Sequence, residues 1–436
     1  MTKVAVTVYA GGLVFQQVFG IKELWGIDFF WIAAIGLVVL TALYTIFGGM
    51  KSVLYTSVLQ TPILLLGSLI ILVLGFKELG GWDEMMRVCG AVTVNDYGDT
   101  MTNLIRSNDD ANFPWLGALI GSAIIGFWYW CTDQFIVQRV LSGKNEMEAR
   151  RGTIFGAYLK LLPVFLFLIP GMIAFALHQK YIGAGGEGFL PMLENGTANA
   201  DAAFPTLVAK LLPAGVKGLV VCGILAALMS SLASLFNSSA MLFTIDFYKR
   251  FRPQTSEKKL VGIGQVATVV IVILGILWIP IMRSVGDVLY TYLQDVQSVL
   301  APGIAAAFLL GICWKRTSAQ GGMWGLISGM VIGLTRLGAK VYYSNAGEVA
   351  DSTFKYLFYD MNWLFFCGWM FLFCIIVVIV VSLATEAPTA EKIQGLVFGT
   401  ATKEQKASTR ASWNHWDIIH TVIILAITGA FYWYFW

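Results

Sequence analysis

The chain has 436 residues, of which 57% are hydrophobic and only 13% are charged, with a formal net charge of +3. A soluble globular chain usually carries about 25% charged residues. This composition excludes a disordered, collagen-like, coiled-coil or nucleic-acid-binding chain, and it fits a polytopic helical membrane protein.

About eleven apolar segments are long enough to cross a bilayer as helices, since each crossing needs about 20 apolar residues. Helices satisfy their backbone groups internally, and these runs are too long for the strands of a membrane barrel. We therefore predict an all-α membrane protein with one transmembrane domain over residues 1–436. The predicted segments are 4–20, 28–47, 52–75, 113–133, 154–177, 216–245, 260–283, 288–313, 320–337, 363–385 and 416–435.

The connections between these segments differ in charge. Four of them are basic, and they alternate with three long connections that are less basic or acidic. Because short basic loops stay in the cytoplasm, we expect the N-terminus inside and the C-terminus outside a plasma or inner membrane. The basic connections are 139–151, 246–259, 315–316 and 392–410; the long ones are 76–112, 178–215 and 338–362.

The sequence carries no catalytic pattern that we can identify. Six cysteines and three histidines occur, without the spacing of a metal site, and there is no phosphate-binding loop or zinc-protease helix. Most of the cysteines lie in or beside apolar runs, so they do not indicate a disulfide framework. We therefore expect a protein that is not an enzyme.

An aromatic cluster ends the segment 113–133, where Tyr129 and Trp130 follow Gly121 and Gly126. The glycines weaken the helix, and transporter sites are often built where a helix is interrupted at mid-membrane. Aromatic rings at such a break could stack on a solute. An interfacial aromatic belt, with Asp133 at the inner surface, explains the cluster about as well.

Lys160 lies about two turns into the segment 154–177. A lysine at a helix centre costs roughly 2.5–3.5 kcal/mol to insert, so a cation there marks a site by default. Lys160 could donate hydrogen bonds to a polar solute in a central cavity. It could also extend its ammonium to the nearby cytoplasmic surface, which the position alone slightly favours.

The segment 216–245 carries a polar stripe. Ala227, Ser230, Ser231 and Ser234 share one helix face at spacings of three and four residues. Neutral hydroxyl and carbonyl oxygens suit a monovalent hard cation, whereas a cage of carboxylates would bind too tightly to release it. Close helix packing through small residues is the commoner explanation of such spacing, by about two to one.

Gln294 begins the segment that leads to Pro302 and Gly303. Its amide offers both a donor and an acceptor, which suits a hydroxyl-rich solute. A capping or interhelical role for Gln294 is about equally consistent with its position.

Together these strings resemble the sodium:solute symporter family, and within it the sodium–glucose cotransporter branch. The likeness extends over essentially the whole chain. The matching strings are YTIFGGMKSVLYTSVLQT at 44–61, WYWCTDQFIVQRVLSGKN at 128–145, YLKLLPVFLFLIPGM at 158–172, LAALMSSLASLFNSSAMLFTIDFY at 225–248, APGIAAAFLLGICWKRT at 301–317 and EKIQGLVFGTA at 391–401.

The resemblance implies the leucine-transporter-type fold, in which two five-helix repeats are inverted relative to each other. Relatives in this branch have fourteen crossings, and the first segment here looks like their fourth. We therefore expect the sequence to lack the first three helices. These include the broken helix that gives the family's sodium site its backbone carbonyls and the sugar some of its polar contacts.

The resemblance also implies residue roles. The Ala227 carbonyl and the Ser230 and Ser231 hydroxyls match the sodium ligands, and Ser234 would face the solute one turn further on. Tyr129 matches a gate tyrosine that stacks beneath the sugar, beside Trp130. Lys160 and Gln294 match residues that bind sugar hydroxyls. Gly126 stands where relatives often have a polar side chain, so that contact is not expected here.

One departure from the family bears on the number of ions. Ser57 stands where the family usually has an aspartate that is linked to a second cation site. We therefore expect symport of one Na⁺ with a small polyhydroxyl solute, such as glucose or galactose. Inositol, sialic acid or a carboxylate remain alternative solutes, and a non-transporting solute sensor is the alternative from another class.

Overall fold

The computed structural model describes residues 2–193, 196–283, 289–346 and 350–435, and nearly all of the secondary structure is helical. The predicted segment 288–313 therefore begins one residue outside the described part of the chain. By its contacts the chain divides into two compact units, the first comprising residues 1–93, 100–102 and 161–289 and the second comprising residues 94–99, 103–160 and 290–436.

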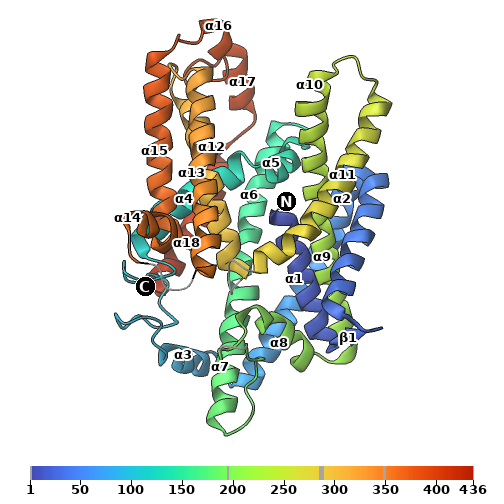
Figure 1. Cartoon of the computed structure of the whole chain (residues 1–436). Coiled ribbons are helices and arrows are strands. Elements are labelled where there is room, and N and C mark those ends of the chain that lie inside the picture. The colour runs from blue at the N-terminus through green and yellow to red at the C-terminus, as the bar shows by residue number, and fades with distance from the viewer. Residues whose placement is uncertain (1, 194–195, 284–288, 347–349, 436) are drawn as a thin grey trace. The chain divides into compact units, whose positions relative to one another are not determined.

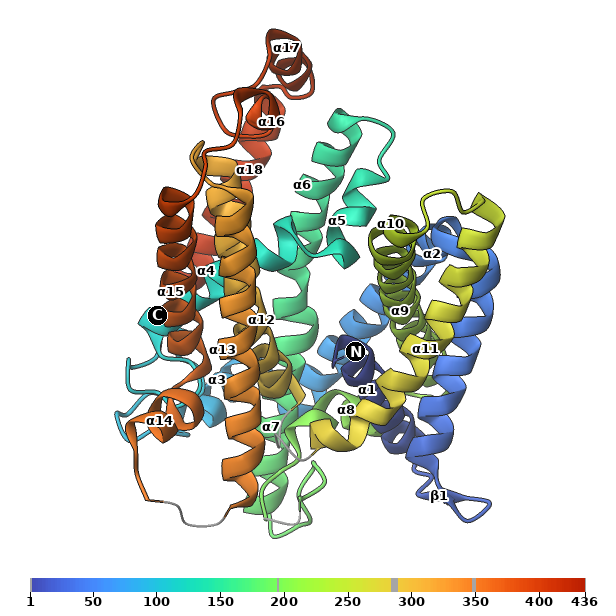
Figure 2. The ribbon, with the colours of Figure 1, turned by 45° about the horizontal axis from the view of Figure 1, so that its top comes forward.

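The first unit is a bundle in which α1, α2, α9 and α11 lie side by side (Figures 1 and 2). A short hairpin of two strands joins α1 to α2, and Asp28 caps the start of α2 by accepting a hydrogen bond from Phe30 N. The elements are α1 (Thr2–Phe19), β1 (Glu23–Leu24), β2 (Ile27–Asp28), α2 (Phe29–Leu79), α3 (Trp82–Gly90), η1 (Val164–Leu168), α7 (Ile169–Gly183), η2 (Ala200–Ala202), α8 (Ala203–Leu211), α9 (Ala214–Met241), η3 (Leu242–Tyr248), α10 (Lys249–Phe251) and α11 (Glu257–Arg283).

The helix α2 contains two of the predicted segments, 28–47 and 52–75, in one run of helical backbone. Its beginning, at Phe29, and its end, at Leu79, pack in the same hydrophobic core. Tyr44 and Ser57 both contact the same level of α9, at Met229 and Ser230. A straight helix of 51 residues would be about 75 Å long, so a first arm that begins at Phe29 and contains Tyr44 and a second arm that contains Ser57 and ends at Leu79 must run in opposite directions.

The second unit packs α4, α12, α13 and α15 around two hydrophobic clusters. Trp128 of α4 meets Ala301 and Ala305 of α12 in one cluster, and Phe366 and Met370 of α15 lie in the other. The elements are α4 (Trp115–Cys131), α5 (Gln134–Leu141), α6 (Glu146–Pro163), α12 (Leu289–Cys313), α13 (Ala319–Asn345), α14 (Thr353–Lys355), η4 (Tyr356–Asp360), α15 (Trp363–Ala384), α16 (Ala390–Ile393), α17 (Lys403–Ala411) and α18 (His415–Tyr434).

Every predicted apolar segment lies in a helix. Seven described helices are long and apolar enough to cross a membrane, and the bent pair α4–α5 would be an eighth. The arm Phe29–Thr45 is a shorter apolar helix, and α1 and α13 contain the two remaining segments. The chain is a multi-pass membrane protein, and the predicted count of about eleven crossings agrees with these helices. The predicted single domain over residues 1–436 stays a prediction.

Candidate functional site

The predicted ligands divide between the two units. Ala227, Ser230, Ser231 and Ser234 lie on α9 in the first unit, whereas Tyr129, Trp130, Lys160 and Gln294 lie in the second. Each group is described within its own unit.

The serine stripe of α9 faces the interior of the first unit. Ser230 is 7% exposed and Ser234 is 2% exposed. The Ser230 and Ser57 hydroxyl oxygens are 2.5 Å apart, and Tyr44 Oη donates to the Met229 carbonyl at 2.8 Å. Both arms of α2 therefore bring a hydroxyl group to the level of α9 where the ion ligands were predicted.

Ser234 has its proton engaged by its own helix. Its hydroxyl donates to the Ser230 carbonyl at 3.0 Å, and Ser238 in turn donates to the Ser234 carbonyl at 2.7 Å. Such bonds to the preceding turn engage the hydroxyl proton of a buried serine. Ser234 can therefore offer a solute only its lone pairs in this arrangement.

The aromatic cluster lies immediately before a break in a helix. The pair α4–α5 bends by 47° between Cys131 and Gln134, and Asp133 caps α5 by accepting a hydrogen bond from Phe135 N. The ring of Tyr129 lies 5.2 Å from that of Trp130 and close to perpendicular to it. A broken helix next to aromatic rings is the arrangement that the solute-site interpretation requires.

Lys160 lies beside this cluster. Its Nζ is 5.6 Å from the centre of the Trp130 ring, close enough for a cation–π interaction. The helical run Glu146–Gly183 has 38 residues, which places Lys160 about 21 Å from the beginning of the run. Lys160 is exposed, so both the extension of its ammonium to the cytoplasmic surface and a contact with a solute stay open. Trp130 thus contacts both Tyr129 and Lys160, and the assignment of the three to a solute stays a prediction.

Gln294 lies on α12, the helix that packs against α4 through Ala301 and Ala305. Its amide nitrogen donates to Tyr290 Oη at 2.9 Å, while its amide oxygen is buried and accepts no hydrogen bond. A buried acceptor without a donor usually has a functional or solvent explanation. Among the described residues, the Gln294 amide oxygen is therefore a buried acceptor whose capacity is unused.

Two polar residues in the membrane region were not predicted from the sequence as candidate site residues. Gln60, on the second arm of α2, has a buried side-chain oxygen that accepts no hydrogen bond. Arg336 of α13 is fully buried; it donates to the Met361 carbonyl at 2.7 Å and lies 3.4 Å from the Asp295 carboxylate. Lys340 approaches the same carboxylate at 2.6 Å. Gln60 is a polar residue within an apolar stretch, which is the signal that could have found it. Arg336 lies at the end of its predicted segment and carries no such signal.

A turn of the connection between α3 and α4 is ordered around a buried carboxylate. Asp110 accepts hydrogen bonds from Asn112 N and Phe113 N and lies 3.5 Å from Arg106. Burial alone would raise the pKa of Asp110, but these donors, with the Asn95 amide, outweigh it and hold the pKa below its ordinary value. The charged form of Asp110 therefore stabilises this turn.

Comparison with known proteins gives consistent matches. The model of the sodium:solute symporter family matches residues 1–329. The chain is 36% identical over 410 residues to human sodium/myo-inositol cotransporter 2, covering 92% of this chain and 60% of that protein. It is 35% identical to bovine sodium/mannose cotransporter SLC5A10, covering 100% and 75%, and 35% identical to mouse sodium/glucose cotransporter 4, covering 92% and 59%.

The chain thus spans about 60% of the length of the myo-inositol cotransporters that it matches. Among solved structures, a Na⁺-coupled sialic acid symporter in a substrate-bound outward-open state matches with a TM-score of 0.62 at 20% identity. The match covers 89% of this chain and 74% of the symporter. This likeness confirms the predicted leucine-transporter-type fold.

Proposed function

Because the chain belongs to the sodium:solute symporter family, whose members are transporters rather than enzymes, we propose that it couples the entry of one Na⁺ to that of a small polyhydroxyl solute. The observation that carries the proposal is the buried serine stripe of α9, where Ser230 meets Ser57 across the helix interface. We assign the Ala227 carbonyl and the Ser230 and Ser231 hydroxyls to the ion.

We assign Tyr129, Trp130, Lys160, Gln294 and Ser234 to the solute. Lys160 donates hydrogen bonds, the Gln294 oxygen accepts them, and the aromatic rings stack on the apolar face of a sugar. A hexose fits this mixture of donors, acceptors and aromatic rings. A carboxylate solute would favour more cationic groups than the single Lys160 among these residues.

One ion supplies enough free energy for accumulation. A charge moving through 100 mV is worth about 2.3 kcal/mol, and a tenfold sodium gradient adds about 1.4 kcal/mol. The total of about 3.7 kcal/mol supports roughly 500-fold accumulation. Coupling arises because Na⁺ stabilises the outward-open state and orders the solute pocket, and it is reciprocal between the two ligands.

Uptake into proteoliposomes tests the proposal. Labelled glucose, galactose, mannose and myo-inositol are offered with an inward Na⁺ gradient and, as the control, with an equal K⁺ gradient. We expect Na⁺-dependent accumulation of at least one hexose. Accumulation of myo-inositol alone would favour the alternative solute, and Na⁺-dependent binding without uptake would favour a sensor. No response to Na⁺ in either assay would contradict the proposal.

We also propose that the basic connections face the cytoplasm of a plasma or inner membrane and that the C-terminus lies outside. The asymmetry in Lys and Arg between alternate connections supports this orientation. A protease site appended after Trp436 should be cleaved by enzyme added to intact cells. Cleavage only after the cells are opened would contradict it.

A further inference from the structure

Our first inference concerns Gln60, which faces α9 by the register of the two helices. Ser57 meets Ser230, Ile63 packs against Gly223, and Gly67 packs against Val220. Residue numbers rise along this arm of α2 as they fall along α9, so the two helices run antiparallel. Interpolation between these contacts places Gln60 opposite Ala227.

The side-chain oxygen of Gln60 is buried, and no described residue donates a hydrogen bond to it. Leaving such an acceptor unpaired carries the full cost of its desolvation, which calls for a compensating partner. A bound cation can be this partner, because amide oxygens are good ligands for hard cations. Gln60 therefore lies opposite Ala227, whose backbone carbonyl is one of the ligands assigned to the ion.

We propose that the Gln60 amide oxygen is a further ligand of the Na⁺ held by Ala227, Ser230 and Ser231. This inference rests on the proposed function, because it needs an ion at that site. A neutral oxygen adds a ligand without adding charge, so the ion can still leave at the end of a cycle. The Gln60 acceptor gains a partner whenever the ion is bound.

Equilibrium binding of radioactive sodium to the purified chain tests this role, with Q60L as the variant. The control is S68A on the same arm of α2. It removes a buried hydroxyl that, like the Gln60 oxygen, has no hydrogen-bond partner among the described residues. We expect Q60L to raise the half-saturating Na⁺ concentration at least tenfold and S68A to change it less than twofold. Without Na⁺, Q60L should melt at the same or a higher temperature than the unmodified chain, because an unpaired buried acceptor is removed.

The outcomes separate the two claims. If the unmodified chain binds no Na⁺, the proposed function fails. If it binds Na⁺ and Q60L titrates like it, the inference about Gln60 is wrong while the proposed function stands. Q60L could instead melt at a lower temperature in the absence of Na⁺ while its Na⁺ affinity stays unchanged in the folded fraction. That result would assign Gln60 a packing role and overturn the inference.

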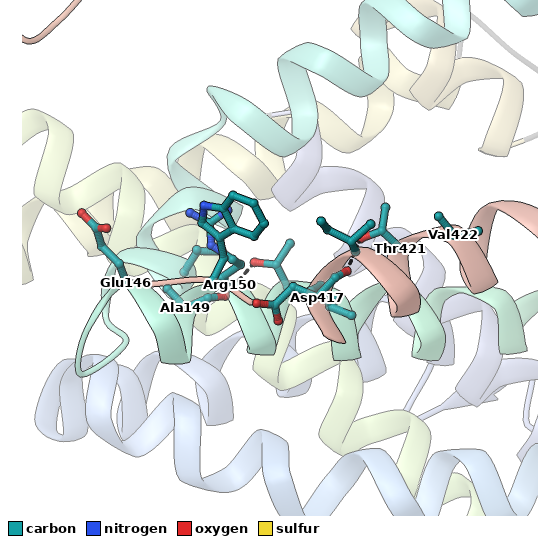
Figure 3. Close-up of a pocket in the computed structure, with 11 residues that line it drawn as sticks. Glu146, Ala149, Arg150, Asp417, Thr421 and Val422 are labelled. Atoms are coloured by element: carbon teal, nitrogen blue, oxygen red, sulfur yellow. Dashed lines mark hydrogen bonds between the residues drawn. The ribbon is translucent and has the colours of Figure 1, made fainter. Parts of the chain in front are cut away.

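A second inference comes from an independent feature, a groove of about 680 Å³ between α6 and α18 (Figure 3). The two helices run in the same direction. Arg150 Nη2 donates to Ser412 Oγ at 3.2 Å, just before α18 begins, and Tyr158 Oη lies 3.0 Å from His420 Nδ1. The groove therefore lies where both helices begin.

The walls of this groove are apolar. Ile418 and Val422 are 52% and 57% exposed. Two threonines in the wall contribute methyl groups, because Thr153 donates its hydroxyl proton to the Ala149 carbonyl and Thr421 donates its own to the Asp417 carbonyl. Both α6 and α18 belong to membrane-spanning runs. An apolar groove on such helices is suited to an acyl chain.

The charged residues of the groove are of both signs. Arg150 and Glu146 are exposed, and Asp417 also lines the groove while it caps α18 by accepting a hydrogen bond from Asn414 N. Arg150 complements a phosphate, and the carboxylates complement a cation. A purely anionic headgroup would be attracted by Arg150 and repelled by Glu146 and Asp417.

We propose that this groove binds phosphatidylethanolamine, with its phosphate at Arg150, its ammonium at Glu146 and an acyl chain along Ile418 and Val422. A headgroup that carries both charges matches the charges of the groove. The primary ammonium also has hydrogen-bond donors for a carboxylate, which the quaternary ammonium of phosphatidylcholine does not have.

Native mass spectrometry of the detergent-purified chain tests this site with phosphatidylethanolamine, phosphatidylcholine and phosphatidylglycerol added separately. We expect phosphatidylethanolamine to bind at least fivefold more tightly than the other two. R150Q should weaken its binding, and E146Q should remove its advantage over phosphatidylcholine. The controls are R151Q and E148Q, which change charges adjacent in sequence that do not line the groove.

The proposal would be overturned by equal binding of the three lipids, by tighter binding of phosphatidylglycerol, or by a dimer of the chain that V422W disrupts. Loss of binding in the two control variants to the same degree would also overturn it, because the effect would then reflect surface charge alone.

Discussion

Substitution of Ser57 by Asp should convert a carrier of one Na⁺ into a carrier of two. Ser57 lies on the second arm of α2 with its hydroxyl oxygen 2.5 Å from that of Ser230. An aspartate at this position would bring a carboxylate to the serine stripe of α9, as the family usually has it. A second cation could then bind between that carboxylate and the serine hydroxyls.

The expected magnitude follows from electrostatics. Opposite unit charges about 4 Å apart attract by about 4 kcal/mol at an effective dielectric constant of 20. Desolvation of the buried carboxylate opposes this gain, and the lost Ser57–Ser230 hydrogen bond is worth only about 0.5–1.5 kcal/mol. A net gain of about 1.4 kcal/mol already corresponds to a tenfold tighter second ion, which is enough to change the stoichiometry.

The assay is the sodium dependence of uptake and the accumulation ratio at steady state. We expect the Hill coefficient for Na⁺ to be about 1 in the unmodified chain and to approach 2 in S57D. The limiting accumulation should rise from roughly 500-fold towards its square, because each ion contributes about 3.7 kcal/mol. S57N, which has nearly the same shape without the charge, should keep one ion. A Hill coefficient near 2 in the unmodified chain would refute the reasoning, as would S57D that transports with one ion.

Further substitutions test the remaining assignments. S231A should raise the half-saturating Na⁺ concentration about tenfold, the equivalent of one lost ligand at about 1.4 kcal/mol, with solute affinity at saturating Na⁺ nearly unchanged; an unchanged Na⁺ affinity would remove Ser231 from the site. K160A and Q294A should each raise the solute concentration for half-maximal uptake severalfold, and a loss of expression alone would indicate packing roles. Because the pKa of Asp110 lies below its unfolded value, its stabilisation of the turn is present above about pH 4 and is lost as the pH falls through the folded pKa. Relative to an unfolded substrate at the same pH, pepsin should therefore cut near Arg106 faster as the pH falls below 4, and D110N should reduce that dependence.

The helices could be predicted because hydropathy is a local property of the sequence. Each apolar run had to become a helix, since a bilayer leaves backbone groups no other partners. The predicted boundary between 28–47 and 52–75 lies within α2, between two arms that run in opposite directions. Glycine costs only about 1 kcal/mol in a helix, so tertiary contacts decide such cases.

The burial of Arg336 could not be predicted in the same way. It lies at the end of the predicted segment 320–337, where a long cationic side chain usually reaches the membrane surface. Its position instead depends on partners far away in the sequence, namely Asp295, the Met361 carbonyl and the Phe366 ring, whose centre is 4.1 Å from the guanidinium carbon. The sequence alone does not show which segments supply those partners, so the cluster becomes visible only in three dimensions.

Coupling between Na⁺ and the solute has a measurable form. Ser231 is assigned to the ion, and Lys160 and Gln294 are assigned to the solute. Coupling between two ligands is a single free energy, so each ligand must change the affinity of the other by the same factor. S231A and Q294A should therefore each alter one intrinsic affinity and leave the coupling factor unchanged, since neither substitution affects both ligands directly. A substitution that lowers the coupling factor while both intrinsic affinities persist would identify a residue that transmits the effect.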